Sequence, residues 1–160
     1  MVRIRLVERE DLNALFALDQ VCFRPGVAYS KLELRYFLFR SSSISLIAED
    51  GKDIAGFAIV EIRAEKNSRT GHIVTIDVDP ARRRQGVGRV LMEALTERCS
   101  EAEATLLWLE VAVDNDAAIA FYGQLGFLKT GRIRGFYLGT LDALTMVKQL
   151  TEQPAGTNIS

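Results

Sequence analysis

The stretch that decides the fold reads Asp79-Pro80-Ala81-Arg82-Arg83-Arg84-Gln85-Gly86-Val87-Gly88-Arg89. Residues 73–78, just before it, are mostly apolar and predict a strand, which ends at Asp79-Pro80 because proline cannot donate to a sheet ladder. After it, apolar residues recur at the spacing of an amphipathic helix that ends near Cys99, namely at Val87, Val90, Leu91, Ala94 and Leu95. The glycines and arginines therefore occupy a turn between a strand and a helix.

This turn has the features of an anion-binding site. Unpaired backbone N–H groups and the helix dipole favour negative charge at a helix N-terminus, and Gly86 and Gly88 let a phosphate approach the main chain closely. Four arginines fall within residues 82–89 of a chain whose net charge is -1, so positive charge is concentrated there. A glycine-containing turn with solvated arginines is the purely structural alternative.

Two other phosphate-binding motifs fit these residues less well. A Walker A loop needs Lys-Ser or Lys-Thr after its last glycine, and Arg89-Val90 stand there instead. A dinucleotide fingerprint needs a glycine at the position of Leu91. Glu110 lies at about the distance of the ribose-binding acid, but within an apolar run and not at a strand end. A Walker A site is excluded, and a dinucleotide site is disfavoured.

The remaining elements are predicted from periodicity, caps and turns, and give the order β-α-α-β-β-β-α-β-α-β-β. Asp50-Gly51 predicts a hairpin, Ser30 and Glu33 form a capping box for a helix that runs through Arg40, and the polar residues 65–70 predict a loop. The other predicted elements are a strand at 3–6, a helix over 12–22, strands at 44–49, 54–62 and 106–113, a helix between Asn115 and Gly126, and strands at 127–134 and 143–150.

Length and charge limit the classes of function. The 160 residues suit one domain over residues 1–150, followed by a loose polar tail over 151–160. The slightly negative net charge provides no general field for nucleic acid or membrane, so neither is an expected partner. Cys22 and Cys99 are expected to be packed thiols, with no metal site. Without a signal peptide or a run of ~20 apolar residues, a cytoplasmic protein is expected.

The turn resembles motif A of the GNAT superfamily, Q/R-x-x-G-x-G/A, with Arg83, Gly86 and Gly88 at its defined positions. The likeness continues through Thr75-Ile76-Asp77-Val78-Asp79-Pro80, Leu107-Trp108-Leu109-Glu110-Val111, Asn115, Ala120-Phe121-Tyr122 and Leu125-Gly126-Phe127. It implies an α/β three-layer sandwich whose mixed, mostly antiparallel sheet has a splayed central strand pair. It also implies acetyl-CoA as cosubstrate, bound by Ile76, Asp77, Val78, Arg83, Arg84, Gln85, Gly86, Val87, Gly88, Arg89 and Asn115.

The resemblance also assigns catalytic roles. Glu110, an ionisable group in an apolar strand, becomes the general base, acting through water, and Tyr122 the general acid for the leaving thiolate. The backbone N–H near Val78 becomes the oxyanion donor. From the residues alone, Glu110 could hydrogen-bond buried neighbours, Tyr122 could be a core tyrosine, and Asn115 could be an N-cap. His72, the only histidine, shows no partner in the sequence and is expected to be incidental.

Within the superfamily, the chain is most similar to bacterial ribosomal-protein alanine N-acetyltransferases. Leu18-Asp19-Gln20-Val21-Cys22-Phe23, residues 107–127 and Arg132-Ile133-Arg134-Gly135-Phe136-Tyr137 carry this likeness. It implies that Phe23 and Tyr137 hold the N-terminus of a peptide or protein acceptor, in a monomer or homodimer. Residues 22–31 contain no acid and 132–142 only one, which disfavours polyamine or aminoglycoside acceptors. A small-molecule amine acetyltransferase and a noncatalytic acyl-CoA-binding module are the alternatives.

Overall fold

The computed structural model describes residues 1–151, and its helices and strands follow the predicted order. They are β1 (Arg3–Leu6), η1 (Arg9–Asp11), α1 (Leu12–Cys22), α2 (Lys31–Phe39), β2 (Ser43–Asp50), β3 (Asp53–Glu65), β4 (Ser68–Val78), η2 (Pro80–Arg82), α3 (Val87–Glu101), β5 (Ala104–Ala112), α4 (Asp116–Gln124), β6 (Leu128–Tyr137) and β7 (Leu141–Gln149). Apart from Thr151, the predicted tail lies outside the described residues. No helix among the described residues combines the length and the apolar character that a membrane span requires.

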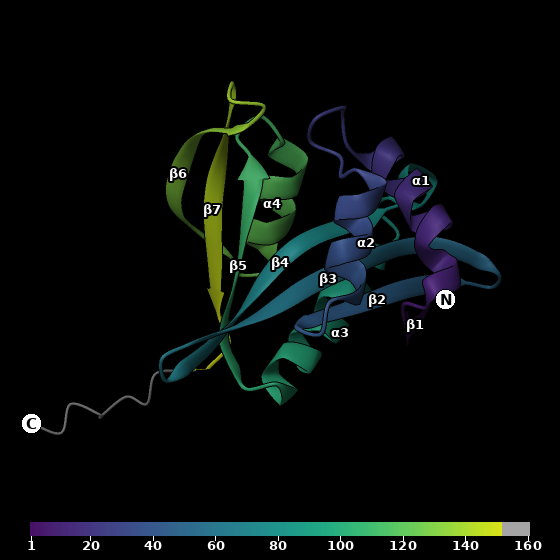
Figure 1. The fold of residues 1–160 in the computed structure, drawn as a ribbon, viewed down its shortest axis with the longest axis horizontal. Helices are drawn as coiled ribbons and strands as arrows, with labels where there is room; N and C mark the ends of the chain where they lie inside the picture. Colours follow the sequence, from purple (N-terminus) through teal and green to yellow (C-terminus); the bar gives the residue numbers. More distant parts are fainter. Residues whose placement is uncertain (152–160) are drawn as a thin grey trace, which may run out of the picture.

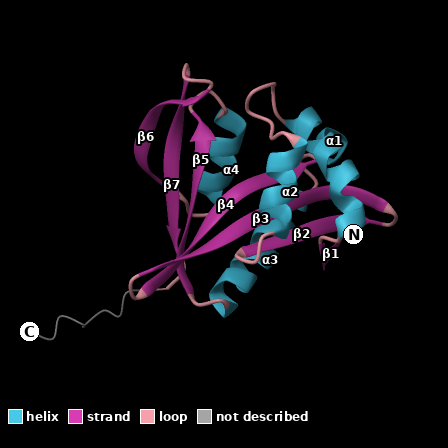
Figure 2. Ribbon diagram, viewed as in Figure 1, coloured by secondary structure: helices cyan, strands magenta, loops and turns pink. Residues whose placement is uncertain are grey.

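The strands form one seven-stranded sheet in the order β1-β2-β3-β4-β5-β7-β6 (Figure 1). Neighbouring strands are antiparallel except β4 and β5, which are parallel. Helices α1 and α2 pack on one face of the sheet, and α3 and α4 on the other (Figure 2). The predicted α/β sandwich with a mixed, mostly antiparallel sheet is therefore confirmed.

The two parallel strands separate partway along their length. They pair from Arg69 with Ala104 to His72 with Trp108, and no pairing between them follows. Strand β4 continues to Val78 and β5 to Ala112, and Figure 2 shows the two strands diverging. The backbone groups that would have joined the strands are left open to the space between them. The predicted splayed pair is thus present.

Residues 65–70 differ from their prediction, because the expected loop is a tight hairpin. Glu65 pairs with Ser68, so only Lys66 and Asn67 connect β3 to β4. Residues 64–69 are exposed, which explains their polar composition: this end of the two strands extends beyond the covering helices. Polarity here marks exposure and not the absence of a strand.

Two apolar clusters lie on opposite faces of the sheet. The cluster beneath α3 and α4 includes Leu91, Leu95, Leu107, Leu109 and Tyr122. The cluster beneath α1 and α2 consists of Leu15, Leu34, Leu38, Ile47, Phe57 and Ile59. The predicted capping box begins α2: Glu33 N–H donates to the Ser30 hydroxyl, and Ser30 N–H donates to the Glu33 carboxylate. The two clusters hold the helices against the sheet on either side of the splay.

Candidate active site

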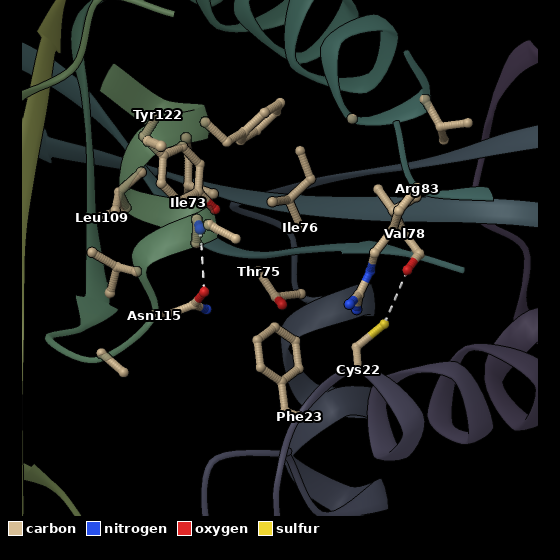
Figure 3. A pocket seen from close by; sticks show the side chains of 18 of the residues that line it. Cys22, Phe23, Ile73, Thr75, Ile76, Val78, Arg83, Leu109, Asn115 and Tyr122 are labelled. Carbon is tan, nitrogen blue, oxygen red and sulfur yellow. Dashed lines mark hydrogen bonds between the residues drawn. The ribbon is translucent and has the colours of Figure 1, made fainter. Parts of the chain in front are cut away.

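A cavity of about 810 Å³ occupies the space between the diverging strands (Figure 3). The η2–α3 turn and α4 form one side of its wall, and the α1–α2 loop and the end of β6 form the other. Thirteen of the predicted site residues line it: Phe23, Ile76, Val78, Arg83, Arg84, Gly86, Val87, Gly88, Arg89, Glu110, Asn115, Tyr122 and Tyr137. The fold thus gathers most of the predicted cofactor, catalytic and acceptor residues around one opening.

The phosphate-binding turn depends on its two glycines for different reasons. Gly86 is the N-cap of α3 with φ of 83°, in the left-handed region where a Cβ is disfavoured. Gly88 has ordinary helical geometry, but a Cβ there would lie 3.1 Å from the Phe121 ring. The first intrahelical bond runs from Val90 N–H to Gly86, so the N–H groups of residues 87–89 are not used by the helix. These free N–H groups are what the predicted anion site requires.

The arginines of the turn make different contacts. Arg82 makes ion pairs with Asp50, Asp53 and Asp79 at 3.5, 3.2 and 3.1 Å, which fasten the turn to the β2–β3 hairpin. Within residues 1–151, no ion pair is found for the other three arginines of the turn. These are Arg83, Arg84 and Arg89, and all three line the cavity. Their charge is available to a bound polyanion.

Two predicted cofactor residues do not bring their side chains to this cavity. Gln85 lies on the outer side of the turn, next to Val87 and Val90 in a separate depression. Asp77 is 1% exposed and is not part of the cavity wall, although Ile76 and Val78 are. Its carboxyl group is instead buried against Thr75 and Asp19. Only its main chain could serve a cofactor.

The main chain at Val78 faces the open gap. Asp79 N–H donates to Ala55 in β3, and Val78 is the next residue along, opposite Gly56. Because bonding alternates along an antiparallel pair, the N–H and C=O of Val78 point away from β3. The Cys22 thiol donates to this carbonyl at 3.3 Å (Figure 3). The Val78 N–H is therefore free to meet a ligand, as an oxyanion donor must be.

Asp77 instead forms a buried pair with Asp19 of α1. The Thr75 hydroxyl donates to Asp77 at 2.6 Å, and Tyr29 N–H donates to Asp19 at 2.8 Å. Burial, followed by the contact with Asp19, raises the pKa of Asp77 well above its ordinary value, which favours its protonated form. This pair was not predicted from the sequence, although an acid within the apolar pattern of α1 was a possible signal.

Glu110 lies on β5 just past the last residue that pairs with β4. Its Oε2 is 2.7 Å from His72 Nε2, and the His72 ring stacks on Trp108 with centroids 4.0 Å apart. The expectation that His72 has no partner is wrong. The parallel register sets His72 beside Trp108, two residues before Glu110, and this pairing could not be read from one strand alone. Glu110 therefore has a defined orientation at the base of the cavity.

Tyr122 lies on α4 and is 7% exposed, packed edgewise against Phe121 and Phe127. It also lines the cavity, and no hydrogen bond within residues 1–151 uses its hydroxyl. Burial raises the pKa of Tyr122, with a smaller contribution from Asp77, so the phenol remains protonated. The residue is both a core tyrosine and an available hydrogen-bond donor.

Asn115 also combines the two roles that its sequence left open. Its side-chain oxygen accepts from Ala118 N–H at 3.1 Å, which makes it the N-cap of α4 (Figure 3). The residue lines the cavity as well. Because the cap uses only the oxygen, the amide N–H groups of the side chain are left for a ligand.

The acceptor side of the cavity is aromatic. Phe23 and Tyr137 line it as predicted, and the structure adds Tyr29 and Val27, which the sequence analysis missed. The Tyr29 hydroxyl donates to the Val74 carbonyl at 3.2 Å. Burial, followed by the charge of Glu110, raises the pKa of Tyr137 to about 12. This side thus offers rings and neutral hydroxyls, with Glu110 as its carboxylate.

The fold and the sequence define an acyltransferase. Residues 12–127 match the Acetyltransferase (GNAT) family, and the chain belongs to that family. It is an N-acetyltransferase. Among the described residues, no group of three or more His, Cys, Asp or Glu could hold a metal ion.

The chain is also similar to individual family members. It is 37% identical over 153 residues to the [Ribosomal protein bS18]-alanine N-acetyltransferase of Escherichia coli K12, covering 91% of this chain and 96% of that one. The crystal structure of the ribosomal-protein-S18-alanine N-acetyltransferase from Escherichia coli superposes with a TM-score of 0.85 at 29% identity, over 100% of this chain and 99% of that one. Human N-alpha-acetyltransferase 30 is 29% identical over 119 residues, covering 74% of this chain and 33% of that one.

Proposed function

We propose that the chain acetylates the N-terminal α-amine of a protein, with Glu110 as base and Tyr122 as hydrogen-bond donor to the leaving thiolate. The proposal is supported by one cavity, which joins the N-terminus of α3, with its unused N–H groups, to an aromatic opening through the gap that holds both residues. Acetyl-CoA would lie with its phosphates at residues 86–89 and its thioester near Val78.

The residues fit a direct transfer. Glu110, through a water molecule, takes a proton from the α-amine, whose nitrogen attacks the thioester carbonyl. Val78 N–H donates to the oxygen that becomes negative. The C–S bond then breaks, and Tyr122 donates a hydrogen bond to the departing sulfur. Since the pKa of Tyr122 is raised while that of a thiol is ~8.5, full transfer of its proton is uphill and hydrogen bonding is the main contribution.

The acceptor opening supports a peptide N-terminus over a polyamine. Its wall contains Phe23, Val27, Tyr29 and Tyr137, and Glu110 is the acid within it. A polyamine would need further carboxylates for its additional charges. The relative that is 37% identical acts on the alanine of ribosomal protein bS18, so an alanine N-terminus of a ribosomal protein is the first acceptor to test. Such a substrate would place the enzyme in the cytoplasm.

The test is mass spectrometry of acetyl transfer to a panel of acceptors. The panel contains peptides with a free N-terminal alanine or serine, the same peptides blocked at the N-terminus but carrying lysine, a polyamine and an aminoglycoside. We expect the free N-termini to be acetylated fastest. Faster acetylation of the polyamine would refute the peptide proposal, and binding of CoA without any turnover would indicate a noncatalytic module.

The base assignment is tested with Glu110→Gln. This variant should bind acetyl-CoA normally but turn over slowly at lower pH, where the amine is mostly protonated. Activity should recover partly as pH rises toward the α-amine pKa of about 8, because solvent then removes the proton. A Glu110→Gln enzyme with the wild-type rate at every pH would eliminate Glu110 as the base.

A further inference from the structure

A row of charged and polar side chains crosses the α2 face of the sheet behind the cavity. Arg40, at the end of α2, binds Glu61 Oε2 at 3.1 Å, and Arg63 binds Glu61 Oε1 at 3.3 Å. Arg63 Nη2 lies 3.4 Å from His72 Nδ1, and His72 Nε2 lies 2.7 Å from Glu110 Oε2. Three neighbouring strands, β3, β4 and β5, thus connect a helix end to the proposed base.

The order of donors along this row determines the state of the histidine. A guanidinium can only donate, so Arg63 requires Nδ1 of His72 to accept and to carry no proton. The ring proton then lies on Nε2, where it points at the carboxylate of Glu110. A doubly protonated ring would set an N–H of His72 against an N–H of Arg63. These contacts therefore favour the Nε2–H tautomer, which donates to Glu110.

The ring is also fixed in position. His72 stacks on Trp108 at 26° between planes, and Arg63 lies 5.0 Å from the centroid of the same indole. Glu61, directly opposite His72 in the β3–β4 register, is 6% exposed and holds Arg63 in place. Glu110 lines the cavity, whereas His72 is not part of its wall. His72 therefore contacts the proposed base from behind.

We propose that His72 is a positioning residue for acetyl transfer: Arg63 holds it as the neutral Nε2–H tautomer, and its hydrogen bond to Oε2 directs Oε1 of Glu110 toward the acceptor. The proposal rests on the proposed role of Glu110 as base. A carboxylate on a mobile side chain would otherwise sample several rotamers, and orientation of a base contributes directly to proton transfer. One oxygen is thus anchored and the other is left for the amine or its bridging water.

The first experiment reads the tautomer directly. His72 is the only histidine, so with any purification tag removed, ¹⁵N NMR of the imidazole reports this ring alone. We expect one protonated and one unprotonated nitrogen at neutral pH, with the proton on Nε2. Arg63→Met keeps an aliphatic stem over Trp108 but frees Nδ1, so the preference for this tautomer should weaken. A proton on Nδ1, or on both nitrogens of the wild type, would overturn the proposal.

The second experiment separates positioning from a merely structural role. His72→Gln places an amide donor near the position of Nε2, whereas His72→Leu has no donor. We expect His72→Leu to lower kcat about 10-fold, as removal of an orienting partner does, with KM for acetyl-CoA unchanged and with much of the loss restored in His72→Gln. Equal kcat in His72→Leu and wild type would overturn the proposal, as would equal losses in both variants.

These results are distinguishable from failure of the proposed function. If Glu110→Gln keeps wild-type turnover, the assignment of the base falls, while the NMR result on the tautomer stands by itself. If Glu110→Gln abolishes turnover and His72→Leu does not change kcat, only the positioning role falls.

Discussion

The predicted phosphate end of the cavity is built around one local turn, residues 82–89, beside α4, whereas its predicted acceptor end combines the α1–α2 loop, β4, β5 and the end of β6. The first end offers main-chain N–H groups held by one left-handed glycine. The second works through individual side chains, such as Glu110 and Tyr137, that meet only in the folded sheet. Substitutions at the first end should therefore change cofactor affinity, and those at the second should change turnover or acceptor binding.

The largest expected effect is at Gly86. Gly86→Val forces a β-branched residue into the left-handed region, which strains the turn and turns the N–H groups of residues 87–89 away from the phosphates. We expect the affinity for acetyl-CoA, measured by calorimetry, to fall at least 100-fold, equivalent to a loss of about 2.7 kcal/mol.

Two variants control this prediction. Gly123→Val changes a glycine on α4 with open space around its Cβ position and no positive φ, and should leave affinity near the wild type. Gly86→Asn, a residue that tolerates the left-handed region better, should lose less than Gly86→Val. If Gly86→Val binds acetyl-CoA as tightly as Gly123→Val does, the turn is not the phosphate site.

The next largest effect is expected at Tyr122, where a single side-chain group is removed and the main chain is unchanged. Tyr122→Phe keeps the packing against Phe121 and Phe127 but removes the hydroxyl that we propose as donor to the leaving sulfur. We expect kcat to fall on the order of 100-fold with acetyl-CoA affinity and thermal midpoint near the wild type. Single-turnover measurement of acetyl transfer separates chemistry from product release.

Tyr36→Phe is the matched control, since Tyr36 is exposed and outside the cavity. It should turn over normally. A Tyr122→Phe enzyme that matches the control while chemistry limits kcat would reduce Tyr122 to a core residue, and the acceptor end would then lack its proposed donor.

The same contrast explains what the sequence could reveal. The conformation of the turn was predictable because its determinants are local: a proline that ends a strand, a glycine that begins a helix, and arginines between them. The element order was predictable for the same reason, including the hairpin at Asp50-Gly51 and the caps at Ser30 and Asn115.

The missed features depend on pairing between distant segments. His72 meets Glu110 only because β4 and β5 are parallel in one particular register, and Asp77 meets Asp19 only because α1 crosses β4. Tyr29 joins the acceptor side through the α1–α2 loop. Glu110 and Tyr122 were predicted through family resemblance, and their residue types alone left structural alternatives open.

The smallest expected effect concerns the buried Asp19–Asp77 pair, which supports the acceptor end by fixing the loop at Tyr29. The raised pKa of Asp77 means that the folded protein binds its proton more tightly than the unfolded chain does. Its contribution to stability is therefore fully present below the unfolded pKa of ~3.9 and is lost as pH rises through the raised value. The groups around it are Asp19, Arg83 and Cys22, together with Thr75.

Asp77→Asn resembles the protonated form, with an amide N–H directed at Asp19 and an oxygen for the Thr75 hydroxyl. The difference in thermal midpoint between Asp77→Asn and the wild type should therefore shift by a few degrees in favour of the variant as pH is raised from 4 to 8. Asp142→Asn is the opposite control, because Gly135 N–H and Arg132 lower the pKa of Asp142. The thermal midpoint of Asp142→Asn should lie below that of the wild type at neutral pH, and this difference should shrink as pH falls through the lowered pKa of Asp142. If Asp77→Asn shows no trend with pH, or the same trend as Asp142→Asn, Asp77 does not hold the proton, and the acceptor loop is positioned by an ordinary carboxylate.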